Sequence, residues 1–294
     1  MKRSTKIFII AVVALLTALG IHLAQEFRFY HLESNWLFLY DWADIWARLK
    51  MTGGLALVIS SFLTQFFRVP LVGVAVTALV YLACGGLIYK VLSRKVPGTA
   101  MAGISLLPAA FMFLCLENDY YGYHAHIALL MNLAALYGYV SIRQTACRIL
   151  CGAAAVILLY QMTGSVTLVF TVSALIWDLS ERGLKGLVSL SYPVVFILMA
   201  MLLIRAGRVD SWEEALTPFM YYSRPSTYFF PIYAWASVPL LMLVAVILNR
   251  FRFSPSKGMA YALAGCVTAF LLAGNLYGKV HSRTTYRMIQ EQYW

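Results

Sequence analysis

Charged residues are scarce in this sequence. Only 12% of its 294 residues are Asp, Glu, Lys or Arg, whereas 62% are hydrophobic and the mean hydropathy is +0.76. Soluble domains carry roughly 25% charged and 45–50% apolar residues, so this composition excludes an ordinary soluble protein. Because a membrane span needs about 20 mostly apolar residues, the apolar runs leave room for roughly eight to ten spans and no separate soluble domain. We therefore predict a single all-α integral membrane domain, a polytopic helical bundle.

Paired cysteines and nucleic-acid motifs are also lacking. The five cysteines lie in or beside apolar runs without a Cys-x-x-Cys spacing, which argues against a disulfide framework. The net charge of +11 is spread over short loops and forms no basic stripe, so we expect no nucleic-acid partner. Acids are fewer than bases, 12 against 23, and the excess of bases indicates the orientation of the spans.

The apolar runs and the bases between them predict a topology. Lys2, Arg3 and Lys6 precede an apolar run without a small-residue cleavage site, which predicts a retained signal anchor with its N-terminus inside. Placing the loops near Lys90, Arg143, Arg182 and Arg250 inside gathers most of the bases there, and the C-terminus then lies outside. A tight hairpin is expected at Gly164. The predicted spans are 7–23, 70–89, 100–116, 127–140, 149–162, 165–177, 187–204, 232–248 and 259–277.

The predicted domain has four parts in chain order. A signal-anchor span (1–24) precedes an outer interfacial segment (25–68), the helical bundle (69–278) and a polar C-terminal segment (279–294). In residues 53–67, small polar side chains such as Ser61 and Thr64 recur at helical spacing opposite Phe62 and Phe66. That pattern favours a helix lying in the membrane interface over one that crosses the bilayer.

The densest group of reactive side chains is the stretch 117–126, between two apolar runs. Carboxylates at a bilayer boundary are costly and are retained mainly where they pair, bind a cation or move protons. Glu117, Asp119, His124 and His126 offer oxygen and nitrogen ligands for a divalent cation. Alternatively, Glu117 or Asp119 acts as a catalytic base, with Tyr120 as a substrate contact. An ordinary interfacial loop is the structural alternative.

Two further outer segments carry candidate residues. Glu26 directly follows the first predicted span and Asp41 lies in the same outer segment, so both are candidate catalytic bases. Arg205, Arg208 and Arg224 could hold a substrate phosphate through paired N–H groups. Arginines beside a span also contact lipid headgroups, which is the competing interpretation.

Two resemblances bear on function. The stretches 37–41 (Leu-Phe-Leu-Tyr-Asp), 53–56 (Gly-Gly-Leu-Ala) and 61–67 (Ser-Phe-Leu-Thr-Gln-Phe-Phe) resemble an uncharacterised bacterial family of multi-span proteins, a domain of unknown function. The likeness is clear over residues 20–80. It implies no activity, but it implies a soluble helical region beyond Trp294. The order of a first span, an acidic outer segment and later spans with a second acidic loop is similar to the layout of GT-C glycosyltransferases.

The GT-C resemblance implies a role for each acidic group. Glu26 or Asp41 would be the base, Glu117 and Asp119 the second acidic motif, and an outer arginine the phosphate clamp. The first outer loop departs from the pattern because it has no adjacent pair of acids. We expect an enzyme that handles a polyprenyl-phosphate-linked sugar at the outer face of the bacterial inner membrane. The alternatives are a non-enzymatic membrane anchor for an envelope protein complex and, third, a transporter or flippase.

Overall fold

The computed structural model describes residues 29, 32–34, 37–96, 100–116, 118, 121–222, 229–251, 262, 266 and 269. Within these ranges all regular structure is helical, and β pairing is confined to an isolated bridge between Tyr121 and Tyr222. The all-α prediction is therefore confirmed. The predicted span 7–23 lies outside the described residues, as do Glu26, Glu117, Asp119, Tyr120 and Arg224, and of the predicted span 259–277 the structure describes residues 262, 266 and 269.

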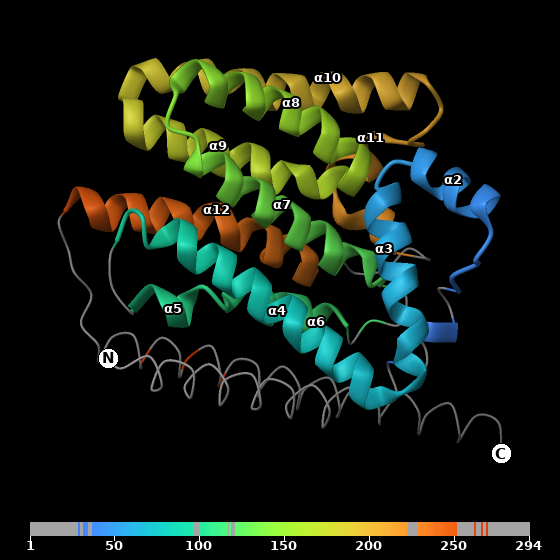
Figure 1. Ribbon diagram of the computed structural model, residues 1–294. Helices are drawn as coiled ribbons and strands as arrows, with labels where there is room; N and C mark the ends of the chain where they lie inside the picture. The colour runs from blue at the N-terminus through green and yellow to red at the C-terminus, as the bar shows by residue number, and fades with distance from the viewer. Residues whose placement is uncertain are drawn as a thin grey trace.

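The long helices lie side by side and their connections alternate between two ends of the bundle (Figure 1). Helix α7 occupies the centre, where it packs against α3, α4, α8 and α9. The elements are α2 (Trp42–Lys50), α3 (Gly54–Thr64), η1 (Gln65–Arg68), α4 (Pro70–Leu92), α5 (Ala100–Ile104), α6 (Leu107–Cys115), α7 (His124–Ser141), α8 (Thr145–Thr163), η2 (Gly164–Val166), α9 (Thr167–Arg182), η3 (Gly183–Leu190), α10 (Ser191–Arg205), α11 (Trp212–Leu216), η4 (Pro218–Tyr221) and α12 (Phe229–Arg250).

Three helical stretches of the described chain are long and apolar enough to cross a membrane. They are Pro70–Leu92, Thr145–Arg205 and Phe230–Arg250. The second stretch is folded into α8, α9 and α10 by Gly164 and Gly183, whose φ angles of 62° and 57° favour glycine. The hairpin predicted at Gly164 is thus present. The predicted span 100–116 is interrupted between α5 and α6.

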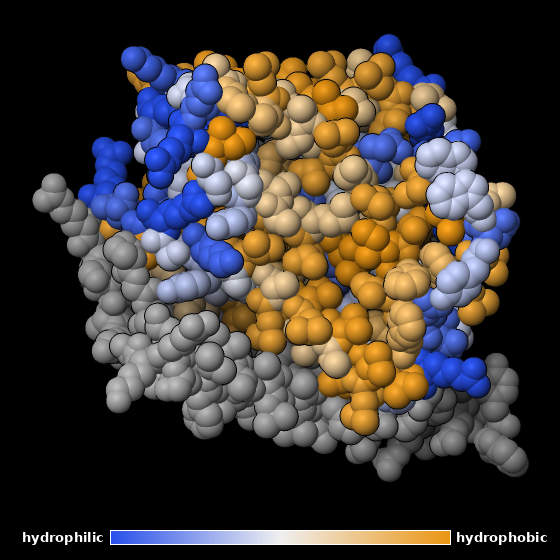
Figure 2. Space-filling model, in the orientation of Figure 1, coloured by the Kyte–Doolittle hydropathy of each residue, from blue (hydrophilic) through white to orange (hydrophobic). Residues whose placement is uncertain are grey.

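On the face shown in Figure 2, an apolar band crosses the middle of the molecule and hydrophilic residues gather at its two ends. On α10 and α12 the band exposes large side chains, including Val194, Leu202 and Leu240, each more than half exposed. A continuous apolar surface of this kind would drive aggregation in water. Against hydrocarbon it carries no such penalty, so the surface fits a membrane.

Helix α3 runs crosswise to the long helices at one end of the bundle (Figure 1). Its small polar residues Ser60, Ser61 and Thr64 are buried, whereas Phe62 and Phe66 are 41% and 45% exposed. An interfacial helix usually turns its polar face to water. Here the polar face turns inward, where the Ser61 hydroxyl accepts a hydrogen bond from Arg48 at 3.3 Å, and the apolar face turns outward.

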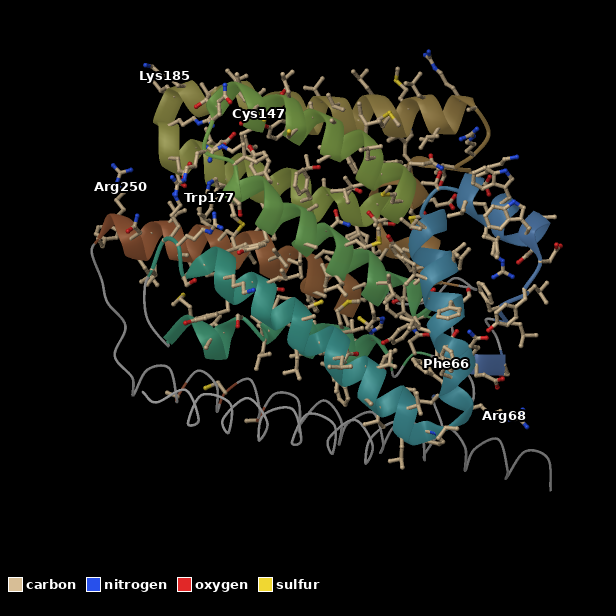
Figure 3. The ribbon with its side chains drawn as sticks, viewed as in Figure 1. Phe66, Arg68, Cys147, Trp177, Lys185 and Arg250 are labelled. Carbon is tan, nitrogen blue, oxygen red and sulfur yellow. The ribbon has the colours of Figure 1, made fainter. Side chains whose placement is uncertain are left out.

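The loops that carry many of the basic residues lie at one end of the bundle. The loops near Lys90, Arg143, Arg182 and Arg250 meet at one end, as the sequence predicts, and we call this the Arg250 end. Figure 3 shows Lys185 and Arg250 there, and Phe66 and Arg68 at the opposite end. That opposite end, formed by α2, α3, η2, α11, η4 and the start of α7, is called the α3 end.

Candidate functional site at the α3 end

The segment that follows α11 is fastened across the α3 end by hydrogen bonds. The Gly122 amide donates to the Tyr221 carbonyl at 2.8 Å, next to the Tyr121–Tyr222 bridge. The Tyr221 hydroxyl donates to the carbonyl of Thr163, and the Ser165 hydroxyl donates to that of Thr217. These bonds hold residues 217–222 against the starts of both α7 and α9.

The turn between α2 and α3 is fixed from the other side. The Gly53 amide donates to the Gln161 carbonyl at 2.9 Å, and the Gln161 side chain donates to the carbonyls of Lys50 and Met51, both at 3.2 Å. Gly53 adopts a φ of 77°, a left-handed conformation that costs glycine little. The turn is thereby held close to the end of α8.

A cavity of about 430 Å³ lies between these fixed segments. It combines two cations, a carboxylate and an imidazole that come from different parts of the sequence. Lys50 and Arg208 are exposed at its rim and outnumber the carboxylate of Glu214, so the cavity is net positive. The lining residues are Lys50, Met51, Thr52, Gly53, Leu57, His124, Gly207, Arg208, Glu214 and Met220.

The structure brings together two of the residues singled out in the sequence, Arg208 and His124. It adds Lys50 and Glu214, which the sequence analysis did not assign to a site. Glu214 is held by a capping arrangement: its amide donates to the Ser211 hydroxyl at 3.2 Å, and its carboxylate accepts from the Asp210 amide at 2.9 Å. The Ser-x-x-Glu spacing that predicts such a cap is legible in the sequence, but its proximity to Lys50 is not.

His126 lies two residues from His124 but in different surroundings. Its Nε2 is 3.1 Å from both the Met112 carbonyl and the Tyr81 hydroxyl, and its ring stacks on Tyr123. Because a carbonyl only accepts, this geometry assigns the proton to Nε2. His126 Nε2 therefore donates its hydrogen bond within the protein. His124 instead packs against Tyr221 and lines the cavity.

The structure describes only some of the residues that were predicted to have catalytic, substrate-binding or metal-binding roles. Asp41 is exposed and caps α2, where its carboxylate accepts from the Ala43 amide at 3.2 Å. Arg205 is exposed in the last turn of α10 and does not line the cavity. Among the described residues, no three or more His, Cys, Asp or Glu side chains form a metal-binding group. The site of Glu117, Asp119, His124 and His126 stays a prediction.

A second polar cluster, at the Arg250 end, was not anticipated. The predicted span 165–177 ends just before Asp178, yet Asp178 is fully buried and pairs with Arg148 at 3.2 Å. Its other oxygen accepts hydrogen bonds from the hydroxyls of Tyr139, at 2.7 Å, and Ser189. Arg148 also pairs with Glu181 at 2.8 Å. The sequence does place Asp178 and Glu181 on one helical face, but the partner helix is visible only in the fold.

Comparison with known proteins assigns a family and no activity. No curated protein and no solved structure matches this chain. A family profile described as a family of unknown function (DUF6057) matches residues 2–294. The likeness expected over residues 20–80 therefore extends across nearly the whole sequence. The chain belongs to this family of unknown function.

Proposed function

We propose that this chain is a multi-pass protein of the bacterial inner membrane that handles a sugar linked to polyprenyl phosphate, as a GT-C-like glycosyltransferase. The α3 end would face outside and the Arg250 end the cytoplasm, in agreement with the positive-inside preference. One observation carries the proposal: Lys50, Arg208 and Glu214 line the same cavity at the α3 end.

The cations suit the phosphate of such a substrate. Arginine and lysine form charge-assisted hydrogen bonds to phosphate that are about twice as strong as neutral ones. Lys50 precedes the α2–α3 turn and Arg208 follows α10, so the two would approach a phosphate from separate segments. Leu57 and Met220 line the same cavity and give a hydrocarbon tail an apolar path toward the band.

The carboxylate of Glu214 would serve as the general base that a glycosyl transfer needs. Glu214 would accept the proton of an acceptor hydroxyl, and that oxygen would attack the anomeric carbon of the sugar. The bond between the anomeric carbon and the phosphate oxygen then breaks, and the electron pair leaves with polyprenyl phosphate. Lys50 and Arg208 would stabilise the charge that develops on this leaving group.

A transfer assay with matched variants tests the proposal. Purified protein is incubated with polyprenyl-phosphate-linked sugars and an envelope extract as acceptor, and product glycan is measured. Glu214→Gln is expected to lower the rate about 100-fold or more, as loss of a general base does. Arg205→Gln, which removes an arginine outside the cavity, is the control. Equal rates for Glu214→Gln and the control would contradict the assigned base.

The same preparation separates the alternative functions. A stoichiometric protein that co-purifies with the chain, in the absence of any bound polyprenyl lipid, would favour the non-enzymatic anchor. Movement of polyprenyl lipid across a vesicle bilayer without sugar transfer would favour the flippase.

A further inference from the structure

A second cavity, of about 540 Å³, lies at the Arg250 end between α9, α12 and the turn after α4. Its walls are apolar, and polar or cationic groups complete its lining. None of its described lining residues is acidic. The lining residues are Lys95, Ile176, Leu179, Ser180, Gly183, Leu243, Val246, Asn249 and Arg250.

Lys95 connects this cavity to the buried cluster around Asp178. Its ammonium lies 4.2 Å from the centre of the Trp177 ring and 3.5 Å from the Glu181 carboxylate. Burial lowers the pKa of Lys95, against the raising effect of Glu181. A poorly hydrated cation of this kind gains from an additional anion nearby.

Several buried polar atoms of this cluster lack a hydrogen-bond partner. In the described part of the chain, three of its buried N–H groups have no hydrogen-bond acceptor: Arg148 Nε, Arg182 Nη2 and Trp177 Nε1. One Asp178 oxygen also lacks a hydrogen bond, although it lies 3.2 Å and 4.0 Å from the two arginines. Buried groups of this kind are normally satisfied. Lys95, Arg148 and Arg182 outnumber Asp178 and Glu181 in this cluster, and Arg250 adds another cation to the cavity lining, so the imbalance favours an anion.

We propose that this cavity binds the phosphate of an anionic phospholipid, with Lys95 and Arg250 as its cationic ligands. The apolar walls favour a lipid over a free phosphate compound. Leu179 and Leu243 are 36% and 43% exposed, so the cavity opens onto the apolar band along which an acyl chain would lie. Basic pockets between membrane helices bind anionic headgroups in this manner. The site lies at the opposite end from Arg208 and does not depend on the proposed transfer.

Native mass spectrometry of the delipidated full chain tests this site by titration with phosphatidylglycerol or with phosphatidylcholine. We expect tighter binding of the anionic lipid, weakened about fivefold by Arg250→Gln because each base near a surface contributes about that factor. Lys95→Gln should act in the same direction. Lys185→Gln, which removes an exposed base from the same end outside the cavity, is the matched control (Figure 3).

Three results would overturn the proposal. Equal affinities for the two lipids would show that the negative net charge of the headgroup does not contribute to binding. Equal losses for Arg250→Gln and Lys185→Gln would show a diffuse surface charge rather than a site. Displacement of the lipid by inorganic phosphate or glycerol 3-phosphate would assign the cavity to a free phosphate compound. Because Arg250 is exposed, its substitution is expected to leave the fold intact.

Discussion

The buried pair of Asp178 and Arg148 gives the sharpest prediction about stability. Asp178→Asn preserves the shape of the side chain but removes the charge that faces Arg148, which is 5% exposed. Removal of one partner from a buried pair costs about 3–5 kcal/mol. Glu181 still faces Arg148 at 2.8 Å, so we expect the free energy of unfolding to fall by about 3 kcal/mol, the lower end of that range.

The assay is reversible unfolding in mixed micelles, with variants that separate burial from charge. Glu181→Gln changes a carboxylate that is 33% exposed and should cost less than about 1 kcal/mol. In a double-mutant cycle, Asp178→Asn combined with Arg148→Met should cost less than the two single changes added together. If Asp178→Asn costs no more than Glu181→Gln, or if the cycle shows no coupling, the buried pair does not stabilise the fold.

Two other substitutions test particular contacts. Gly164→Ala should destabilise by about 1–3 kcal/mol, because its φ is 62° and an added Cβ would lie 2.4 Å from Met220; Gly138→Ala, at an open helical position, should be neutral or stabilising, and equal costs would refute the strain argument. His126→Phe should lower the free energy of unfolding by about 1–3 kcal/mol, because the Met112 carbonyl loses a donor. Unfolding measurements check each change, and an unchanged midpoint for His126→Phe would show that its hydrogen bond contributes nothing.

Apolar runs were sufficient to predict most of the helices. The predicted span 70–89 became α4, which begins at the predicted Pro70 because proline fits the first turn of a helix. The boundaries were less well predicted where charges are buried. Helix α9 continues beyond Trp177 to Arg182 because Asp178 and Glu181 find partners on neighbouring helices. A sequence pattern treats a charge after an apolar run as a loop residue and cannot show such partners.

The sequence predicted some residues of the candidate site but not which residues lie together. His124 stood out because it belongs to the dense group of acids and histidines in 117–126, and Arg208 because arginines can hold a phosphate through paired N–H groups. Lys50 and Glu214 did not, because no periodicity relates segments so distant in sequence. Their proximity follows from the hydrogen bonds of Gln161 and Tyr221, which hold the α2–α3 turn and residues 217–222 against the bundle. The inward polar face of α3 was likewise invisible, since helical spacing defines a face but not what it contacts.

We propose that the cavity at the α3 end holds a polyprenyl phosphate through Arg208. Native mass spectrometry with lipid extraction on gently purified protein tests it most directly, with Arg205→Gln as the matched control. We expect a bound polyprenyl phosphate or phospho-sugar that the wild type and Arg205→Gln retain and that Arg208→Gln loses. Only bulk phospholipid in all three proteins would contradict it.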